Sequence, residues 1–360
     1  MTRLRGEEVV LSSRRATHTW RGLAAESTRL AGWLKDEGVQ RGDRVACHTD
    51  DSVTLFTLMI AAWRLGAVFA PINTSMGPKQ KSSILGTLRP VVLLADGTND
   101  LDAAGATRVL DVRAAPGVTD EQIRIPLSRE EIALILFTSG SSGTPKGVIT
   151  THEALLSNVE LTADALGITE KDRILINTPA YFTSAICHFL TMVVRGAALH
   201  SHEGFLFHST FVELISEYGC SGFGGSPAHL NRIFPPMADA SPKPPTLRFV
   251  MNSGDHLPRY VIQKALAVYP SLEIYCVYGL TEVAGRLFIL DPKFLPEKAG
   301  SVGKPLCGMR VRLLDEELQP CSPREFGEVY VDGPMLTPGY FETRPRALNC
   351  APPSASAPGT

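Results

Sequence analysis

Short apolar runs recur along the chain, and helix-patterned segments separate most of them. Alternation of this kind is typical of α/β layers whose strands are buried and run mainly parallel. The runs are "DRVACH" (43–48), "AVFAPI" (67–72), "VVLLA" (91–95), "IALILF" (132–137), "LRFVM" (247–251) and "EIYCVY" (273–278). The sequence therefore predicts an α/β fold, with layered α/β subdomains and mainly parallel sheets up to about residue 300.

Two stretches are predicted to contain buried helices. Residues 19–36 have apolar side chains at helical spacing and are followed by a glycine that favours a stop. The most apolar stretch, 55–72, is interrupted by an arginine, a glycine and a proline. It therefore predicts a buried helix followed by a strand, and no membrane span. The N-terminus lacks the apolar core of a signal peptide.

The pattern changes beyond about residue 300. Short strands are predicted around "MRVRLLD" (309–315) and "GEVYVDG" (327–333), which glycine and proline turns separate. We expect a small β-rich subdomain over 301–341, which would complete one large domain over 1–341. Residues 342–360 are rich in Ala, Pro and Ser and are predicted to be disordered.

Charge and cysteine content limit the classes of partner. The chain has 35 basic and 37 acidic residues, a formal net charge of −2, and no long basic block. This balance argues against nucleic-acid binding. The cysteines are odd in number, scattered and never spaced as C-x-x-C, which predicts a reduced, cytoplasmic protein without a cysteine metal site. They are Cys47, Cys187, Cys220, Cys276, Cys307, Cys321 and Cys350.

A glycine-rich loop, "LFTSGSSGTPKGV" (136–148), follows the strand predicted at 132–137. After it, "TTHEALLSNVELTADAL" (150–166) predicts a helix, with Thr150 and Glu153 in capping-box spacing. A strand, a glycine-rich loop and a helix together form a nest of backbone N–H groups that binds anions.

The side chains of this loop suit a polyphosphate, because hydroxyls donate to phosphate oxygens and a lysine supplies positive charge. They are Thr138, Ser139, Ser141, Ser142, Thr144 and Lys146, with Gly140, Gly143 and Gly147 between them. The common P-loop spacing G-x-x-x-x-G-K-[ST] is absent. Composition alone would equally fit a mobile surface turn.

Two further strands end in residues that suit a ligand. Tyr278 ends one strand, with Thr281 and Glu282 in the loop beyond it, and the strand at 247–251 runs into "NSGDHLP" (252–258). Ligands of open α/β sheets bind outside the carboxyl ends of strands. Tyr278 could stack on a purine, Thr281 could bond a phosphate, and Glu282 could hold Mg²⁺. Asn252 or Asp255 could reach a base edge, where Gly254 leaves space. The alternative for each is an ordinary edge or solvated side chain.

Several motifs resemble those of the adenylate-forming superfamily, which includes acyl-CoA synthetases, the adenylation domains of peptide synthetases, and luciferases. They are "VQRGDRVA", "GAVFAPINTSMGPKQKSSILGTLRPVVLLAD", "LFTSGSSGTPKGV", "YGLTE" and "FGEVYVDGPMLTPGYF". The resemblance covers about residues 10–341 and implies the large N-terminal domain of these enzymes. It also implies an activity: ATP-dependent conversion of a carboxylate to an acyl-adenylate, usually followed by transfer to coenzyme A or a phosphopantetheinyl carrier.

The resemblance also implies roles for residues of this chain. Thr138, Ser139, Gly140, Ser141, Ser142, Gly143, Thr144 and Lys146 would hold the β- and γ-phosphates. Thr281 would lie near the α-phosphate and Glu282 on Mg²⁺, so that Lys146, Thr281 and Glu282 would carry catalysis. Tyr278 would pack on adenine, with Gly254 and Asp255 on its other side, and Gly279 would also belong to the nucleotide site.

The acid is constrained by the segment "NTPAYFTSAICH" (177–188). Members that activate amino acids have an aspartate where this chain has Phe182, and a buried ammonium without a counter-charge is costly. We therefore expect a carboxylic acid that lacks an α-amino group, such as a fatty or aryl acid. The candidate pocket wall is Tyr181, Phe182, Ser226 and Gly279, although each could equally belong to the core. His188 is expected to be a structural histidine.

The end of the sequence departs from the family pattern. Members continue after "GYF" with a motif like R-T-G-D, a hinge and a small C-terminal domain that carries a catalytic lysine; here the chain reads "ETRPRALNCAPPSASAPGT". We therefore expect the C-terminal lid domain to be absent, weak adenylation by this chain alone, and thioester formation only with a C-terminal domain or carrier in trans. The alternatives are a non-catalytic nucleotide or acyl-ligand binder, and an enzyme that diverged to another nucleophile.

Overall fold

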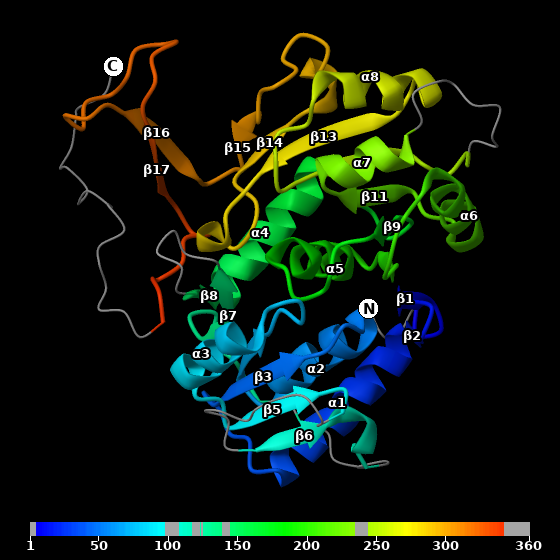
Figure 1. The fold of residues 1–360 in the computed structure, drawn as a ribbon, viewed down its shortest axis with the longest axis vertical. Helices are drawn as coiled ribbons and strands as arrows, with labels where there is room; N and C mark the ends of the chain where they lie inside the picture. Colours follow the sequence, from blue (N-terminus) through cyan, green and yellow to red (C-terminus); the bar gives the residue numbers. More distant parts are fainter. Residues whose placement is uncertain are drawn as a thin grey trace.

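The described residues of the computed structural model form two large sheets and one small sheet (Figure 1). The model describes residues 5–97, 108–116, 123, 125–138, 145–234 and 244–341. Both large sheets are mainly parallel, so the predicted α/β fold is confirmed.

The first sheet has six strands in the order β6-β5-β3-β4-β7-β8. All neighbouring pairs are parallel except β7 with β8. Its strands are β3 (Arg44–His48), β4 (Val68–Pro71), β5 (Val92–Ala95), β6 (Val109–Asp111), β7 (Ile132–Thr138) and β8 (Lys146–Thr151). Apolar residues of α3 (Pro78–Leu88) pack on one face, and α1 (Trp20–Asp36) and α2 (Ser52–Arg64) pack on the other.

The second sheet has nine strands in the order β15-β14-β13-β12-β11-β9-β10-β1-β2. The central strands are parallel, and β14, β15 and β2 pair antiparallel at the two edges. Its strands are β1 (Val9–Ser12), β2 (Thr17–Thr19), β9 (Arg173–Ile176), β10 (Ala198–Ser201), β11 (Gly222–Gly225), β12 (Phe249–Asn252), β13 (Glu273–Tyr278), β14 (Phe288–Leu290) and β15 (Lys304–Pro305).

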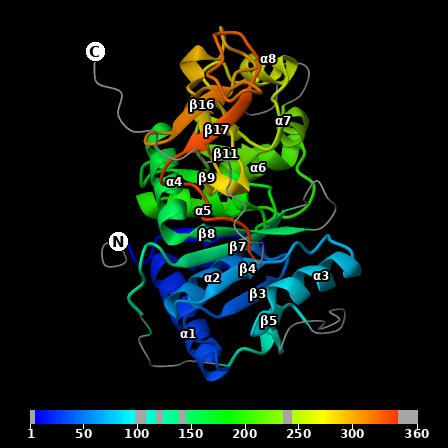
Figure 2. The same cartoon turned by 90° about the vertical axis from the view of Figure 1, so that its left-hand side faces the viewer.

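Helices cover both faces of this second sheet. One apolar cluster joins it to α6 (His208–Tyr218), α7 (Pro227–Ile233) and α8 (Arg259–Val268). Another joins its opposite face to α4 (His152–Ala165) and α5 (Thr183–Arg195), and this cluster continues into α1 and α2 of the first sheet. The stacked rings of Phe56 and Phe189, 4.5 Å apart, connect α2 to α5. The helices between the two sheets are visible in Figures 1 and 2.

The glycine-rich loop differs from the prediction in its surroundings. It connects β7 to β8, which pair antiparallel, so the expected passage from the loop directly into a helix is wrong. The β-branched run from Val148 to Thr151 favours the extra strand. Helix α4 begins at His152, and its N-cap is Thr151, whose side chain accepts a hydrogen bond from the Ala154 N–H. The predicted capping box of Thr150 and Glu153 is therefore wrong by one residue.

Beyond residue 300 the predicted short strands are present as β16 (Arg310–Leu314) and β17 (Glu328–Asp332), an antiparallel pair. This pair stands beside the larger sheets in Figure 1. Residues 335–341, here called the closing segment, then return to β8. Phe341 N–H donates to the Gly147 carbonyl at 2.7 Å, and Ile149 N–H donates to the Gly339 carbonyl at 3.1 Å.

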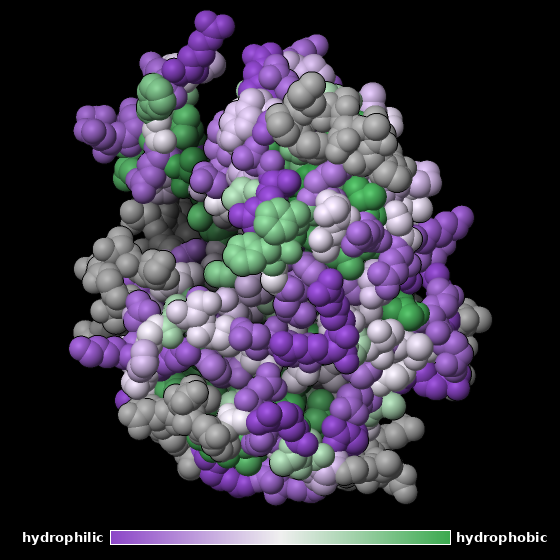
Figure 3. Space-filling view, turned by 45° about the vertical axis from the view of Figure 1, so that its right-hand side comes forward, coloured by the Kyte–Doolittle hydropathy of each residue, from purple (hydrophilic) through white to green (hydrophobic). Residues whose placement is uncertain are grey.

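The remaining short elements are the 3₁₀ turns Val112–Ala114, Thr281–Val283 and Pro292–Phe294. Within the described ranges, no helix is long and apolar enough to cross a membrane. The visible described surface in Figure 3 is largely hydrophilic, with hydrophobic residues in small groups. The predicted disordered tail, 342–360, lies outside the described residues.

Candidate active site

The carboxyl ends of three neighbouring parallel strands bring the candidate residues together. Strands β11, β12 and β13 lie side by side in the nine-stranded sheet. Ser226 follows the first strand, the segment 252–255 ends the second, and the segment 278–282 ends the third. Because parallel strands end at one edge of a sheet, side chains more than 50 positions apart share two adjoining cavities there.

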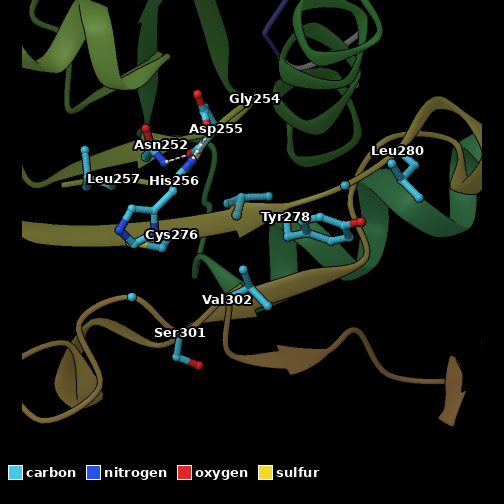
Figure 4. Close-up of a pocket in the computed structure, with 13 residues that line it drawn as sticks. Asn252, Gly254, Asp255, His256, Leu257, Cys276, Tyr278, Leu280, Ser301 and Val302 are labelled. Atoms are coloured by element: carbon cyan, nitrogen blue, oxygen red, sulfur yellow. Dashed lines mark hydrogen bonds between the residues drawn. The ribbon is translucent and has the colours of Figure 1, made fainter. Parts of the chain in front are cut away.

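The first cavity, here called the outer pocket, has a volume of about 400 Å³. Figure 4 shows Tyr278 at the end of β13, with Asn252 and Asp255 on one side of the strand and Ser301 and Val302 on the other. The Tyr278 side chain is 39% exposed and contacts Phe288 edge to face. An exposed aromatic ring at the rim of a cavity suits a planar ligand.

Asn252 gives the outer pocket one unpaired acceptor. Its Nδ2 donates to the backbone carbonyl of Asp255 at 3.0 Å, which fixes the orientation of the amide. Its Oδ1 is buried and has no hydrogen-bond partner in the described part of the chain. A buried acceptor without a partner is costly, so this atom is suited to a donor that a ligand brings.

The second cavity, here called the inner pocket, has a volume of about 410 Å³. It shares Gly254, Val277, Gly279 and Leu280 with the outer pocket, so the two cavities adjoin. The remaining described lining is Thr178, Pro179, Phe182, Thr183, Ser184, Cys187, Ser226, His229, Ser253, Thr281, Gly285 and Arg286. This lining contains no Asp or Glu.

Of the four residues predicted for the pocket wall, three line the inner pocket: Phe182, Ser226 and Gly279. Phe182 precedes helix α5 and is 46% exposed. Tyr181 is not part of the lining; it is buried, and its hydroxyl oxygen lies 3.3 Å from Ser75 Oγ. The structure therefore places the Tyr181 side chain against the segment before α3.

A close backbone approach shapes the wall between the two cavities. A Cβ at Gly279 would lie 1.7 Å from the carbonyl oxygen of Gly285, so no side chain fits there. Gly285 itself has φ of +128°, a conformation that favours glycine. Thr281 follows this wall, and its Oγ1 lies 3.2 Å from Thr183 Oγ1 at the start of α5.

Tyr340 of the closing segment connects two candidate residues from distant parts of the sequence. Its hydroxyl donates to Glu282 Oε1 at 2.9 Å, and Lys146 Nζ lies 5.6 Å from the centre of its ring. Burial, with the Glu282 hydrogen bond as the next cause, raises the pKa of Tyr340. "PGYF" is part of the family motif, but sequence reasoning assigned no role to this tyrosine.

Thr138 and Lys146 face each other as the last and first residues of β7 and β8. The loop between these strands contains Ser139, Gly140, Ser141, Ser142, Gly143 and Thr144, which lie outside the described residues. The structure therefore places the Lys146 end of the predicted phosphate loop beside the Tyr340 ring.

A buried cation closes one side of the inner pocket. Arg286 is 4% exposed; its Nη2 donates to His188 Nδ1 at 3.0 Å and its Nη1 donates to Thr191 Oγ1 at 3.2 Å. Burial and the nearby guanidinium hold the pKa of His188 well below its usual range. His188 is thus a buried histidine bonded to an arginine. Sequence reasoning missed Arg286, because its exposure depends on the three-dimensional fold.

His229 also lines the inner pocket, although sequence reasoning gave it no role. Its Nδ1 accepts a hydrogen bond from the Ser226 N–H at 3.2 Å, which completes a capping box at the start of α7. Burial, then the charge of Arg232, lowers the pKa of His229. A neutral ring that already caps a helix is well placed to form part of the wall.

Comparison with curated proteins finds CoA ligases and CoA synthases among the relatives. A 2-succinylbenzoate–CoA ligase of Bacillus velezensis is 27% identical over 339 residues, which are 93% of this chain and 68% of the relative. A feruloyl-CoA synthase of an Amycolatopsis species is 28% identical over 336 residues, which are 91% of this chain and 67% of the relative.

Solved structures give the same fold. The o-succinylbenzoate coenzyme A synthetase of Bacillus subtilis in complex with AMP has a TM-score of 0.86 and 25% identity, covering 95% of this chain and 88% of that one. The N-terminal domain of FACL13 from Mycobacterium tuberculosis has a TM-score of 0.85, covering 95% of this chain and 89% of that one. The AMP-binding enzyme family model matches residues 2–341. The chain therefore belongs to the AMP-binding enzyme family.

Proposed function

We propose that this protein activates a carboxylic acid without an α-amino group, using ATP to form an acyl-adenylate and pyrophosphate. The observation that carries the proposal is the pair of adjoining pockets at the carboxyl ends of β11, β12 and β13. One pocket suits a nucleobase and the other suits an acyl group, and they meet at Gly279 and Leu280. We take residues 1–341 as the domain that does this, with α/β subdomains to about residue 300.

In this proposal adenine occupies the outer pocket. Tyr278 packs on one face of the base, and Gly254 and Asp255 lie on its other side. The exocyclic amine of adenine donates to the unpaired Oδ1 of Asn252, which supports the fit of the pocket to this base. The relative from Bacillus subtilis that was solved with AMP has the same fold at 25% identity.

The phosphates extend from the outer pocket toward the Tyr340 ring. The loop 138–147 holds the β- and γ-phosphates with its amides, its hydroxyls and Lys146. Thr281, which lines the inner pocket, lies near the α-phosphate, where the carboxylate attacks. These donors hold the reacting groups in place and stabilise the charge that develops on phosphorus and on the leaving pyrophosphate.

Glu282 is the proposed ligand of Mg²⁺. The described residues contain no cluster of three or more His, Cys, Asp or Glu that could hold a metal ion. A single carboxylate fits, because Mg²⁺ is usually bound by one or two carboxylates together with substrate phosphates and water. Bound there, the ion would neutralise charge on the phosphates. Tyr340 orients the Glu282 carboxylate through its hydrogen bond.

The inner pocket takes the acyl group. Its described lining contains no carboxylate that could pair with an ammonium group, which supports an acid without an α-amino group. The apolar side chains Phe182, Val277 and Leu280 suit a fatty or aryl acid. The named relatives are ligases of 2-succinylbenzoate and ferulate.

Transfer to coenzyme A or to a phosphopantetheinyl carrier is the proposed second step, with a C-terminal domain or carrier protein supplied in trans where needed. A cytoplasmic location is part of the proposal. It is supported by the free thiols of Cys47, Cys187, Cys220, Cys276, Cys307 and Cys321, which form no disulfide within the described ranges.

Calorimetric titration with ATP and Mg²⁺ tests the nucleotide site. We expect Lys146→Ala and Glu282→Ala each to weaken binding about tenfold, because each removes a charge that contacts the phosphates or their metal ion. Lys293→Ala, an exposed lysine outside both pockets, is the control and keeps the wild-type affinity. Unchanged affinity in both site variants would exclude this assignment.

Exchange of labelled pyrophosphate into ATP over a panel of acids tests the chemistry. Acid-dependent exchange is the expected result, measured with and without a separately supplied C-terminal domain. If ATP binds but no acid supports exchange in either condition, the protein is a nucleotide-binding relative without adenylation activity.

A further inference from the structure

The guanidinium of Arg286 is a buried positive charge without an acidic partner. Its side-chain hydrogen bonds go to a neutral imidazole and a hydroxyl, and no ion pair of Arg286 is found among the described residues. Burial lowers the pKa of this arginine, which reflects the cost of holding the charge there. A buried cation is stable when it is paired, so this one is suited to an anion that a ligand brings.

His188 holds the Arg286 guanidinium in place from one side. Arginine can only donate, so His188 Nδ1 accepts and the neutral ring carries its proton on Nε2. His188 is buried, and its Nε2 has no partner in the part of the chain that the structure describes. The ring lies against β11, where a Cβ at Gly224 would lie 2.6 Å from Nε2. The absence of a side chain at Gly224 thus allows the ring to pack directly against the strand.

Arg286 lines the inner pocket, and its partners His188 and Thr191 lie behind it on helix α5, outside the described lining. Ser184 and Cys187 of helix α5 line the pocket. His188 lies four residues after Ser184, and Thr191 lies four residues after Cys187, so each shares a helix face with a lining residue. Thr183, which contacts Thr281, marks the opposite end near the proposed α-phosphate position. Thr183 and Thr191 are separated by about 12 Å along the helix axis, from the rise per residue.

We infer that the substrate is a dicarboxylic acid whose second carboxylate pairs with Arg286 at the inner end of this pocket. The inference rests on the proposed function and adds the substrate class. The carboxylate that is activated lies at the Thr281 end, and the other accepts hydrogen bonds from the guanidinium of Arg286, which lines the pocket. Arginine suits this role because its planar fork binds a carboxylate through two parallel hydrogen bonds.

Direct binding tests the inference without requiring turnover. The full chain is titrated calorimetrically with pairs of acids of equal length. Each pair consists of an α,ω-dicarboxylate and the matching monocarboxylate, from about four to nine carbons. Benzene dicarboxylates are compared with benzoate in the same way. At least one diacid should bind at least about tenfold more tightly than its partner. If no pair differs by more than about threefold, the inference is wrong.

Arg286→Met should lower affinity for that diacid at least about thirtyfold more than affinity for its monocarboxylate, because only the diacid loses a charge partner. Arg286→Lys keeps the positive charge but lacks the planar guanidinium, and it should reduce the preference for the diacid over the monocarboxylate about tenfold. This variant tests the inference if circular dichroism shows that Arg286→Met is unfolded. Arg232→Met, an exposed arginine outside the pocket, is the control. A preference that survives in both Arg286 variants overturns the inference.

Pyrophosphate exchange separates this inference from the proposed function. Exchange supported by monocarboxylates and diacids alike, with no diacid preference, overturns the inference and leaves the proposed function in place. A diacid that binds through Arg286 but supports no exchange overturns the proposed function and leaves the binding site in place.

Discussion

At the scale of single residues, the site depends on polar atoms that the fold buries without partners. Asn252 Oδ1 in the outer pocket and His188 Nε2 beside the inner pocket are both buried and unpaired within the described ranges. The cost at Asn252, which lines the outer pocket, is tolerable if a ligand satisfies the atom in the working complex. Such atoms are therefore sharper guides to ligand chemistry than pocket shape alone.

Asn252→Ala should weaken ATP binding about tenfold, because it removes the acceptor for the adenine amine. It should also reduce the preference for ATP over GTP, whose guanine presents a carbonyl at the corresponding position. Titration of both nucleotides measures the two effects. Asn231→Ala is the matched control, since Asn231 Oδ1 bonds Lys264 outside both pockets. Equal loss of ATP and GTP affinity would contradict the role in base recognition.

The sequence predicted candidate residues at the strand ends, and it gave no signal for Arg286 and Tyr340, which the structure places beside them. Tyr278 ends a strongly apolar run, and Thr281 and Glu282 come shortly after it. Such a run predicts a buried strand, and the residue at its end is exposed. Arg286 and Tyr340 carry no such signal. Their roles depend on contacts with His188 and Glu282, which are 98 and 58 positions away in the sequence. No local pattern encodes such a contact.

At the scale of elements, two neighbouring threonines precede helix α4, and only one of them caps it. Thr151 caps the helix, whereas Thr150 Oγ1 is buried without a partner among the described residues. Thr151→Ala should lower the free energy of unfolding by about 1 kcal/mol, because it removes the cap. Urea unfolding measures this change.

Thr150→Val serves as the matched variant, because it removes a buried unpaired hydroxyl while keeping the shape of the side chain. It should leave stability unchanged or raise it slightly. If Thr150→Val were the more destabilising of the two, the cap would belong to Thr150, as the sequence pattern predicted.

The strands divide into those that the sequence predicts and those that it does not. Strands β3, β4, β5, β7, β12 and β13 were predicted because they are continuous apolar runs. Strand β11 reads "GFGG", and glycine has low strand propensity. Strands β1 and β2 form the far edge of a sheet whose nearest partner, β10, lies almost 190 positions later. Their pairing depends on the assembled sheet and not on local sequence.

At the scale of the whole molecule, the fold wholly or partly buries many histidines and so favours their neutral form. Burial is the largest cause of a lowered pKa for each histidine in one group: His18, His48, His152, His188, His200, His202 and His229. For His200 the pKa falls to about 4. Its Nδ1 lies 2.9 Å from Ser12 Oγ, across the β1 and β10 pair.

The fold should therefore lose stability on acidification. A histidine whose pKa is lowered in the folded state binds a proton more readily when the protein is unfolded. Its contribution to the free energy of unfolding is therefore complete above about pH 6.5 and is lost as the pH falls toward the folded pKa. We expect the urea midpoint to fall between pH 7.5 and 5. His200→Gln should make the decline shallower between about pH 6.5 and 4, whereas His256→Gln, an exposed histidine, should not. An identical decline in both variants would contradict the role of His200.

The closing segment ties the last described residues to both large parts of the site. Its backbone bonds reach Gly147 and Ile149 of β8, and Thr337 N–H donates to the Glu282 carbonyl at 2.9 Å. The segment therefore holds two elements together. Strand β8, with Lys146 at its start, can separate from the turn that carries Glu282 only if these hydrogen bonds break together. Local unfolding there should be cooperative, so that the proposed phosphate-binding charge of Lys146 and the proposed metal-binding carboxylate of Glu282 would be lost in one event.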